Sequence, residues 1–179
     1  MHSFYKSIGL YEHLSFNMDM NKSEFIESLR KITYKTNTNF ISLVPDNGIP
    51  TRFEYRGIVN PNNFTIRRRI RFFDSNISAS IIKGQFLEKN NRMEISIEFF
   101  PLRFHILILL LFSISFLIIV LYLDRKENNE FIFPLIMMPI IISTTHYFTV
   151  KRNIQRSKYD FERELYFISQ KNTQLKKFK

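Results

Sequence analysis

Two long apolar segments constrain the fold of this 179-residue chain more than any other feature of its sequence. Residues 104–123 read FHILILLLFSISFLIIVLYL and residues 131–150 read FIFPLIMMPIIISTTHYFTV, without any Asp, Glu, Lys or Arg. As a helix, each segment would extend about 30 Å, which is the thickness of a bilayer core. A chain this short has little protein left to cover two helices that are apolar all round. The sequence therefore predicts a transmembrane hairpin of two helices.

The charges beside these segments predict how the hairpin is oriented. Residues 124–130 form a short polar turn whose basic residues are Arg125 and Lys126, so the two spans are expected to be antiparallel neighbours. Basic residues are more frequent outside the hairpin, as at Lys151 and Arg152. Because Lys and Arg favour the cytoplasmic side, we expect a multi-pass protein of the plasma (inner) membrane with both termini in the cytoplasm.

The remaining composition excludes several classes of protein. The formal net charge is +10, and the chain contains no Cys, which excludes a disulfide scaffold, a thiolate metal site and a Cys nucleophile. Residues 1–10 lack the apolar core of a signal peptide. We therefore expect the residues before the hairpin to remain in the cytosol.

Residues 1–101 show the patterns of a small α+β domain. Residues 12–18 alternate apolar and polar side chains, as a half-buried strand does, and an amphipathic helix is expected at about residues 22–34. Further alternating runs, separated by Asn-, Pro- and Asp-rich turns, predict strands at residues 52–59, 64–72, 77–87 and 92–99. The prediction is a cytosolic antiparallel sheet of about four to six strands with one helix.

The C-terminal segment, residues 151–179, is basic and amphipathic. Ile154, Phe161, Ile168 and Leu175 recur every seven residues, which predicts a helix over about residues 151–172, either separate from the second span or continuous with it. Packing of this helix against the sheet is favoured over a coiled-coil dimer, because the repeat is short. The chain is thus divided into a domain at 1–101, a hairpin at 102–150 and this basic helix and tail.

A run of arginines is the most prominent polar feature. Alternation places Arg67, Arg69 and Arg71 on the outer face of one strand. One interpretation is a solvated face with cross-strand acids such as Glu94 and Glu98. Another is contact with anionic lipid headgroups. Nucleic acid is disfavoured, because the interleaved aromatic residues alternate to the opposite face.

Two further predictions concern charged residues near the arginine run and the hairpin. Arg68 lies among the apolar positions of its strand, so we expect it to pair with an acid or to reach the sheet edge. Basic residues directly after the hairpin are further candidates for contact with anionic lipid: Lys151, Arg152 and Arg156.

Motifs for catalysis, metal binding or cofactor binding are missing from the sequence. It contains no nucleotide-binding glycine loop, no HExxH and no GxSxG. His105 and His146 would meet at the cytosolic end of an antiparallel hairpin, either as a proton or metal pair or as ordinary interfacial residues. We predict no cofactor, no metal site and no catalytic residue.

Several stretches resemble a group of small, uncharacterised two-span integral membrane proteins from AT-rich bacterial genomes. The stretches that carry the resemblance are residues 53–57, 64–70, 82–84 and 95–97, and Pro101. The resemblance implies the same architecture, and it implies no activity.

The predicted function is that of an integral membrane protein with a membrane-tethered cytosolic binding module. Its expected partners are the lipid bilayer, anionic headgroups, and either another protein or further copies of the chain. One alternative is a small oligomeric channel or transporter subunit, lined by Ser113, Ser115, Ser143 and Thr144. A second alternative is an enzyme with an interfacial site. Such a site needs an acid–base pair, and the two apolar segments contain none.

Overall fold

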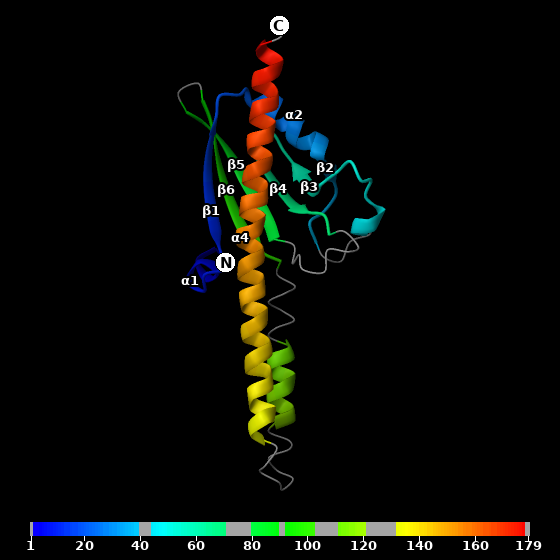
Figure 1. Cartoon of the computed structure of the whole chain (residues 1–179), viewed down its shortest axis with the longest axis vertical. Helices are drawn as coiled ribbons and strands as arrows, with labels where there is room; N and C mark the ends of the chain where they lie inside the picture. Colours follow the sequence, from blue (N-terminus) through cyan, green and yellow to red (C-terminus); the bar gives the residue numbers. More distant parts are fainter. Residues whose placement is uncertain are drawn as a thin grey trace.

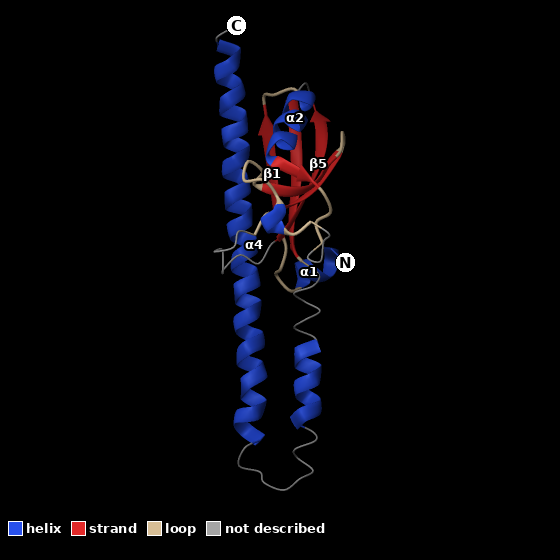
Figure 2. Ribbon diagram, turned by 90° about the vertical axis from the view of Figure 1, so that its right-hand side faces the viewer, coloured by secondary structure: helices blue, strands red, loops and turns tan. Residues whose placement is uncertain are grey.

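A computed structural model describes residues 2–39, 44–70, 80–89, 92–102, 111–120 and 132–177 of the chain. The longest element is helix α4 (Ile132–Lys177), which packs along one face of a six-stranded sheet and projects beyond it (Figure 1). The helical segment 111–120 lies beside the projecting half of α4 (Figure 2). Helix α1 (His2–Ser7) lies at the end of the sheet that is nearer to this segment.

The sheet combines a meander with one strand from earlier in the chain at each edge. Its strands, in their order across the sheet, are β1 (Glu12–Met18), β6 (Arg92–Pro101), β5 (Ser80–Lys89), β4 (Asn63–Arg68), β3 (Tyr55–Val59) and β2 (Thr33–Lys35). Strands β3 to β6 pair as consecutive antiparallel neighbours, and β1 pairs antiparallel with β6. Strand β2 pairs parallel with β3.

The sheet is therefore mixed, and the prediction of a purely antiparallel sheet is wrong. Helix α2 (Lys22–Ile32) connects β1 at one edge to β2 at the other. The parallel strands β2 and β3 are joined by residues 36–54, and a connection of this length can return the chain in the same direction, whereas a tight hairpin cannot produce this pairing. Strand β2 has only three residues, which is too short for alternation to reveal it in the sequence.

Local sequence explains the elements on either side of the first turn. The strand predicted at residues 12–18 is confirmed, and its alternation buries Phe16 and Met18. In α2, spacing of three and four residues places Phe25, Ile26 and Leu29 on one buried face. The helix ends where Thr33 becomes extended, with φ −114° and ψ 120°, and leads directly into β2.

The core lies between the sheet and helices α2 and α4. Phe161 of α4 is fully buried, and its ring centroid lies 5.6 Å from that of Tyr55, 5.8 Å from Phe64 and 6.3 Å from Phe99. On the α2 side, the rings of Phe25 and Phe86 are 5.6 Å apart. The predicted packing of the C-terminal amphipathic helix against the sheet is thus confirmed.

The predicted transmembrane hairpin is contradicted. Within the described parts of the chain, no helix is both long enough and apolar enough to cross a bilayer. Of the first predicted span, 104–123, only residues 111–120 are described, and they extend about 15 Å as a helix. The predicted turn at 124–130 lies outside the described residues.

The second predicted span, 131–150, does not form a separate element. Its residues 132–150 belong to α4, which continues without a break to Lys177 and contains Pro139 in its interior. Polar residues from Ser143 to His146 dilute the apolar character before the basic residues Lys151 and Arg152. The C-terminal amphipathic helix is thus continuous with the second apolar segment, which is one of the two alternatives that the sequence left open.

Three further predictions depended on the hairpin and are corrected with it. They are the integral membrane protein with a tethered cytosolic domain, the channel or transporter subunit, and the multi-pass location in the plasma membrane with both termini in the cytoplasm. Each needed two helices that cross a bilayer, and the described residues contain none.

The ring cluster around Phe161 predicts a large mutational effect on stability. Replacing Phe161 by Ala removes the side chain that contacts three rings of the sheet, so the free energy of unfolding should fall by about 3–5 kcal/mol. Urea unfolding followed by circular dichroism measures this change. Tyr159→Ala, two residues away and 67% exposed, is the matched control and should cost less than about 0.5 kcal/mol. An equal effect of both substitutions would contradict the assignment of the core.

Candidate functional site

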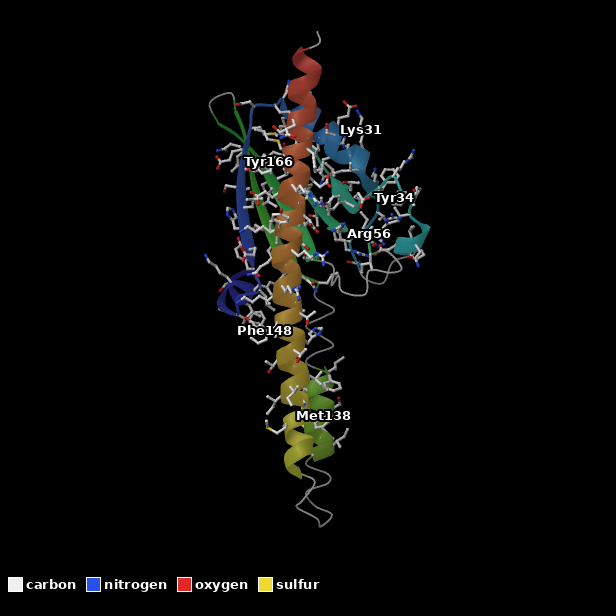
Figure 3. All side chains as sticks on the ribbon, viewed as in Figure 1. Lys31, Tyr34, Arg56, Met138, Phe148 and Tyr166 are labelled. Carbon is white, nitrogen blue, oxygen red and sulfur yellow. The ribbon has the colours of Figure 1, made fainter. Side chains whose placement is uncertain are left out.

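Three arginines lie buried on the sheet face opposite α4. Arg56 and Arg67 are cross-strand neighbours on β3 and β4, and each is only 1% exposed (Figure 3 labels Arg56). Arg69, directly after β4, is 7% exposed. Backbone carbonyls of the segment between β2 and β3 accept hydrogen bonds from these guanidinium groups, at Asn37, Thr38, Val44 and Ile49. The segment therefore covers this part of the sheet.

Asp46 supplies the carboxylate of this cluster. Its Oδ1 lies 2.5 Å from Nη1 of Arg56, and its Oδ2 lies 2.8 Å from Nη1 of Arg67. The backbone N–H of Ile70 also donates to Oδ2, at 3.1 Å. Burial raises the pKa of Asp46, but the hydrogen bonds from the two arginines and from Ile70 bring this pKa below its ordinary value. The carboxylate thus holds the covering segment on the sheet.

This arrangement corrects the expected role of the arginine run. Alternation correctly placed Arg67 and Arg69 on the face opposite the apolar residues, but that face is covered, so neither side chain is available to lipid headgroups. Arg71 lies outside the described residues. Glu94 and Glu98 belong to β6, which is separated from β4 by β5, so they are not the cross-strand partners of these arginines.

Replacing Asp46 by Asn should destabilise the fold in a manner that depends on pH. At pH 7 the change leaves two buried guanidinium groups without their carboxylate, and the expected loss is about 3 kcal/mol. Because the folded pKa is lowered, this stabilisation is present above the unfolded pKa of about 4 and is lost as the pH falls through the folded pKa. Urea midpoints at several pH values should therefore show a gap to wild type that narrows in acid.

The control for Asp46 is an exposed ion pair. Glu27 and Lys31 lie 2.8 Å apart on the surface of α2, each with a side chain that is 70% exposed. Glu27→Gln should cost only about 0.3–0.5 kcal/mol. If Asp46→Asn cost no more than this control, Asp46 would not hold the segment as described.

A second polar cluster lies between the sheet and α4. Nη1 of Arg68 lies 2.5 Å from Oδ2 of Asp160, which confirms the predicted pairing of Arg68 with an acid. Burial raises the pKa of Glu164; Arg163 opposes this rise, whereas Glu54 adds to it. Burial also raises the pKa of the Tyr55 hydroxyl, with Glu164 adding to the effect. The nearby charges of Arg68 and Arg163 thus do not offset the effects of burial and of Glu54 and Asp160 on the pKa of Glu164.

Replacing Glu164 by Gln should stabilise the protein at neutral pH. An acid whose folded pKa is raised weakens the fold once it is ionised, so stability is lost as the pH rises through that pKa. The variant should therefore have a higher urea midpoint than wild type at pH 8 and an equal midpoint at pH 4. A variant that is less stable than wild type at pH 8 would contradict the assigned direction of the pKa.

The projecting end of the molecule carries exposed apolar side chains on two helices. We name these helices, residues 111–120 and residues 137–149 of α4, the apolar pair (Figures 2 and 3). Their contact includes Oγ of Ser113 and Oγ of Ser143, which are 3.5 Å apart. The large apolar side chains exposed on the pair are Leu111, Phe112, Ile114, Leu117, Ile118, Ile119, Met137, Met138, Ile140, Ile141, Ile142 and Phe148.

The remaining predicted site residues are distributed along α4. Arg152 and Arg156 are exposed and Lys151 is half-buried. His146 is half-buried in α4, whereas His105 lies outside the described residues, so the predicted histidine pair is not tested. Across the described ranges, no three His, Asp or Glu side chains are grouped closely enough to hold a metal ion.

Comparison with known proteins gives no further assignment. No protein-family profile matches the chain, and no curated protein matches it either. The resemblance to small two-span bacterial proteins therefore stays a prediction.

Sequence reasoning missed two groups of residues. Asp46 stood in an apparent Pro-Asp-Asn-Gly turn, and nothing near it in the sequence indicates its two arginine partners. The exposed rings of Tyr159, Tyr166 and Phe167 lie outside the inward stripe that predicted the helix. Plotting the outward positions at 100° per residue would have revealed them.

Proposed function

We propose that the chain is a non-catalytic binding protein that assembles with further copies of itself through the apolar pair. The observation that supports this proposal is the exposure of large apolar side chains on both helices, outside the side where the helices face each other. The sheet domain would then position the pair, because α4 belongs to both parts of the molecule.

The exposed residues do not form a single stripe. Ile140, Ile141 and Ile142 are consecutive, so they point in directions about 100° apart, and they are 52%, 59% and 41% exposed. A helix that is apolar all round is normally buried on all sides. The neighbouring segment 111–120 covers only one side of α4, so other apolar surfaces are needed to cover the rest.

Another copy of the chain offers a matching surface. Two copies would bring four helices together, and in a four-helix bundle each helix packs against two neighbours. Each half-exposed Leu, Ile or Met side chain contributes about 1 kcal/mol when it is covered. Opposing this, each copy carries a net charge of +10. Added salt screens that repulsion, so the association should strengthen as ionic strength rises.

The full-length chain tests this proposal. Sedimentation equilibrium should show an oligomer whose mass distribution shifts upward with added NaCl. The apolar-pair variant combines Leu117→Gln, Ile118→Gln and Ile141→Gln, at side chains that are 61%, 60% and 59% exposed. Because these side chains are exposed, the variant should fold, and because it loses apolar surface, it should remain monomeric. The matched control changes exposed apolar residues of the sheet domain, Phe4, Ile58 and Leu87, to Gln and should assemble like wild type.

Three outcomes would contradict self-association. They are a monomeric wild type, an unchanged oligomer in the apolar-pair variant, and a control variant that dissociates equally. Flotation with phosphatidylcholine vesicles tests whether a lipid surface covers the apolar pair instead. If wild type associates with the vesicles and the apolar-pair variant does not, a lipid surface rather than another copy covers the pair.

A further inference from the structure

The upper half of α4 presents an outward face that combines arginines with aromatic rings. The exposed residues between Arg152 and Gln170 are Arg152, Gln155, Arg156, Tyr159, Arg163, Tyr166, Phe167 and Gln170. At 3.6 residues per turn they lie within about 120° of the helix surface. The buried residues Ile154, Phe161 and Leu165 lie on the opposite side, against the sheet. We name this exposed set the α4 outer face.

The arginines of this face have no acidic neighbours within it. Asp160, four residues after Arg156, is directed to Arg68 of the sheet, and Glu162 and Glu164, which flank Arg163, lie off the face. In the described parts of the structure, no carboxylate lies within ion-pair distance of Arg152, Arg156 or Arg163. An ordinary solvent-facing helix mixes charges of both signs, as Glu27 and Lys31 do on α2. The α4 outer face therefore carries three positive charges and no acidic side chain of its own, and only Arg163 is partly offset by the neighbouring Glu164.

The aromatic rings are exposed beside these arginines. Tyr159 is 67% exposed, Phe167 57% and Tyr166 52%. Tyr166 contacts Phe16 of β1 edge to face, with ring centroids 4.9 Å apart, which holds this ring in place (Figure 3). Exposed rings close to a fixed backbone lose little conformational entropy when a partner covers them.

The composition of the face matches that of protein interface cores. Tyr, Phe and Arg are enriched in such cores, whereas Lys, Glu, Asp, Ser and Ala are depleted, and none of these five types occurs on the α4 outer face. The lysines of this part of α4 lie off the face: Lys158, for example, donates to Glu12 of β1 at 2.8 Å. This selection of Arg over Lys favours a protein partner over a diffuse anionic surface.

We propose that the α4 outer face binds an acidic amphipathic segment of a partner protein. Carboxylates of the segment accept paired hydrogen bonds from the arginines, and its apolar side chains cover the rings. A second copy of this chain is a poor occupant, because two such faces would oppose arginine to arginine. The inference is thus independent of self-association through the apolar pair.

Fluorescence anisotropy with a labelled peptide tests the proposal on the full-length chain. The probe is a helical peptide of about 20 residues, matching a face of roughly 27 Å, with Leu at heptad positions a and d and Glu at most others. A peptide with Gln in place of every Glu is the uncharged control. Wild type should bind the acidic peptide, and this binding should weaken as salt is added. The affinity for the Gln peptide should be at least about tenfold lower than the affinity for the acidic peptide.

Matched variants separate this face from general positive charge. One variant combines Arg152→Gln, Arg156→Gln and Arg163→Gln. Because it removes three ion pairs between the face and the peptide, it should weaken peptide binding by about tenfold or more. Lys6→Gln, Lys31→Gln and Lys35→Gln combined remove the same charge from exposed positions elsewhere and should change binding less than about threefold. Circular dichroism confirms that all variants are folded.

Two further variants distinguish the possible outcomes. Tyr159→Ser with Phe167→Ser should weaken binding by reducing ring contact at unchanged charge. The apolar-pair variant, Leu117→Gln with Ile118→Gln and Ile141→Gln, should bind the peptide as wild type does, so failure of self-association does not affect this test.

Several results would overturn the proposal. They are the absence of peptide binding, an equal loss in the arginine and lysine variants, and no effect of the ring substitutions. Tighter binding of oligo-dT or phosphatidylserine vesicles than of the peptide, lost in the arginine variant, would assign the face to nucleic acid or to lipid instead.

Discussion

The packing of α4 on the sheet through Phe161 is the contact on which the rest of the molecule depends. One fully buried ring meets aromatic residues from β3, β4 and β6, so the helix position is fixed relative to most of the meander. Because α4 is a single continuous helix, this contact also fixes the direction of its projecting half. The apolar pair lies beyond the sheet for this reason, and the arginine-rich face points away from the domain for the same reason.

Two polar clusters, one buried and one half-buried, affect this architecture in opposite ways. Asp46 accepts hydrogen bonds from Arg56 and Arg67 and has a lowered pKa, so ionisation strengthens the attachment of the segment that covers the sheet. Glu164 lies at the α4 interface with a raised pKa, so its ionisation weakens the docking of the helix. The fold therefore combines a firmly held covering segment with a helix whose docking includes an electrostatic cost.

Strands with clear alternation could be predicted from the sequence, because a half-buried strand reveals its two faces locally. Strand β1 was predicted with correct bounds, and Arg67 and Arg69 were placed on the correct face. Their burial could not be predicted, since it depends on a covering segment that lies about twenty residues earlier in the chain. Likewise, α4 combines an apolar segment with an amphipathic one, and the change of pattern could not decide between two helices and one continuous helix.

The continuity of α4 also connects the two proposed interactions. At 100° per residue, Met138, Ile141 and Phe148 project from the same side of the helix as Arg152 and Tyr159. A second copy that covers the apolar side chains would bring its own α4 alongside, and the arginines of the two outer faces would then approach one another. Binding of an acidic segment neutralises these arginines and removes part of that repulsion. Because salt screens charges on exposed surfaces, this effect is small at physiological ionic strength, and the two interactions can be measured separately.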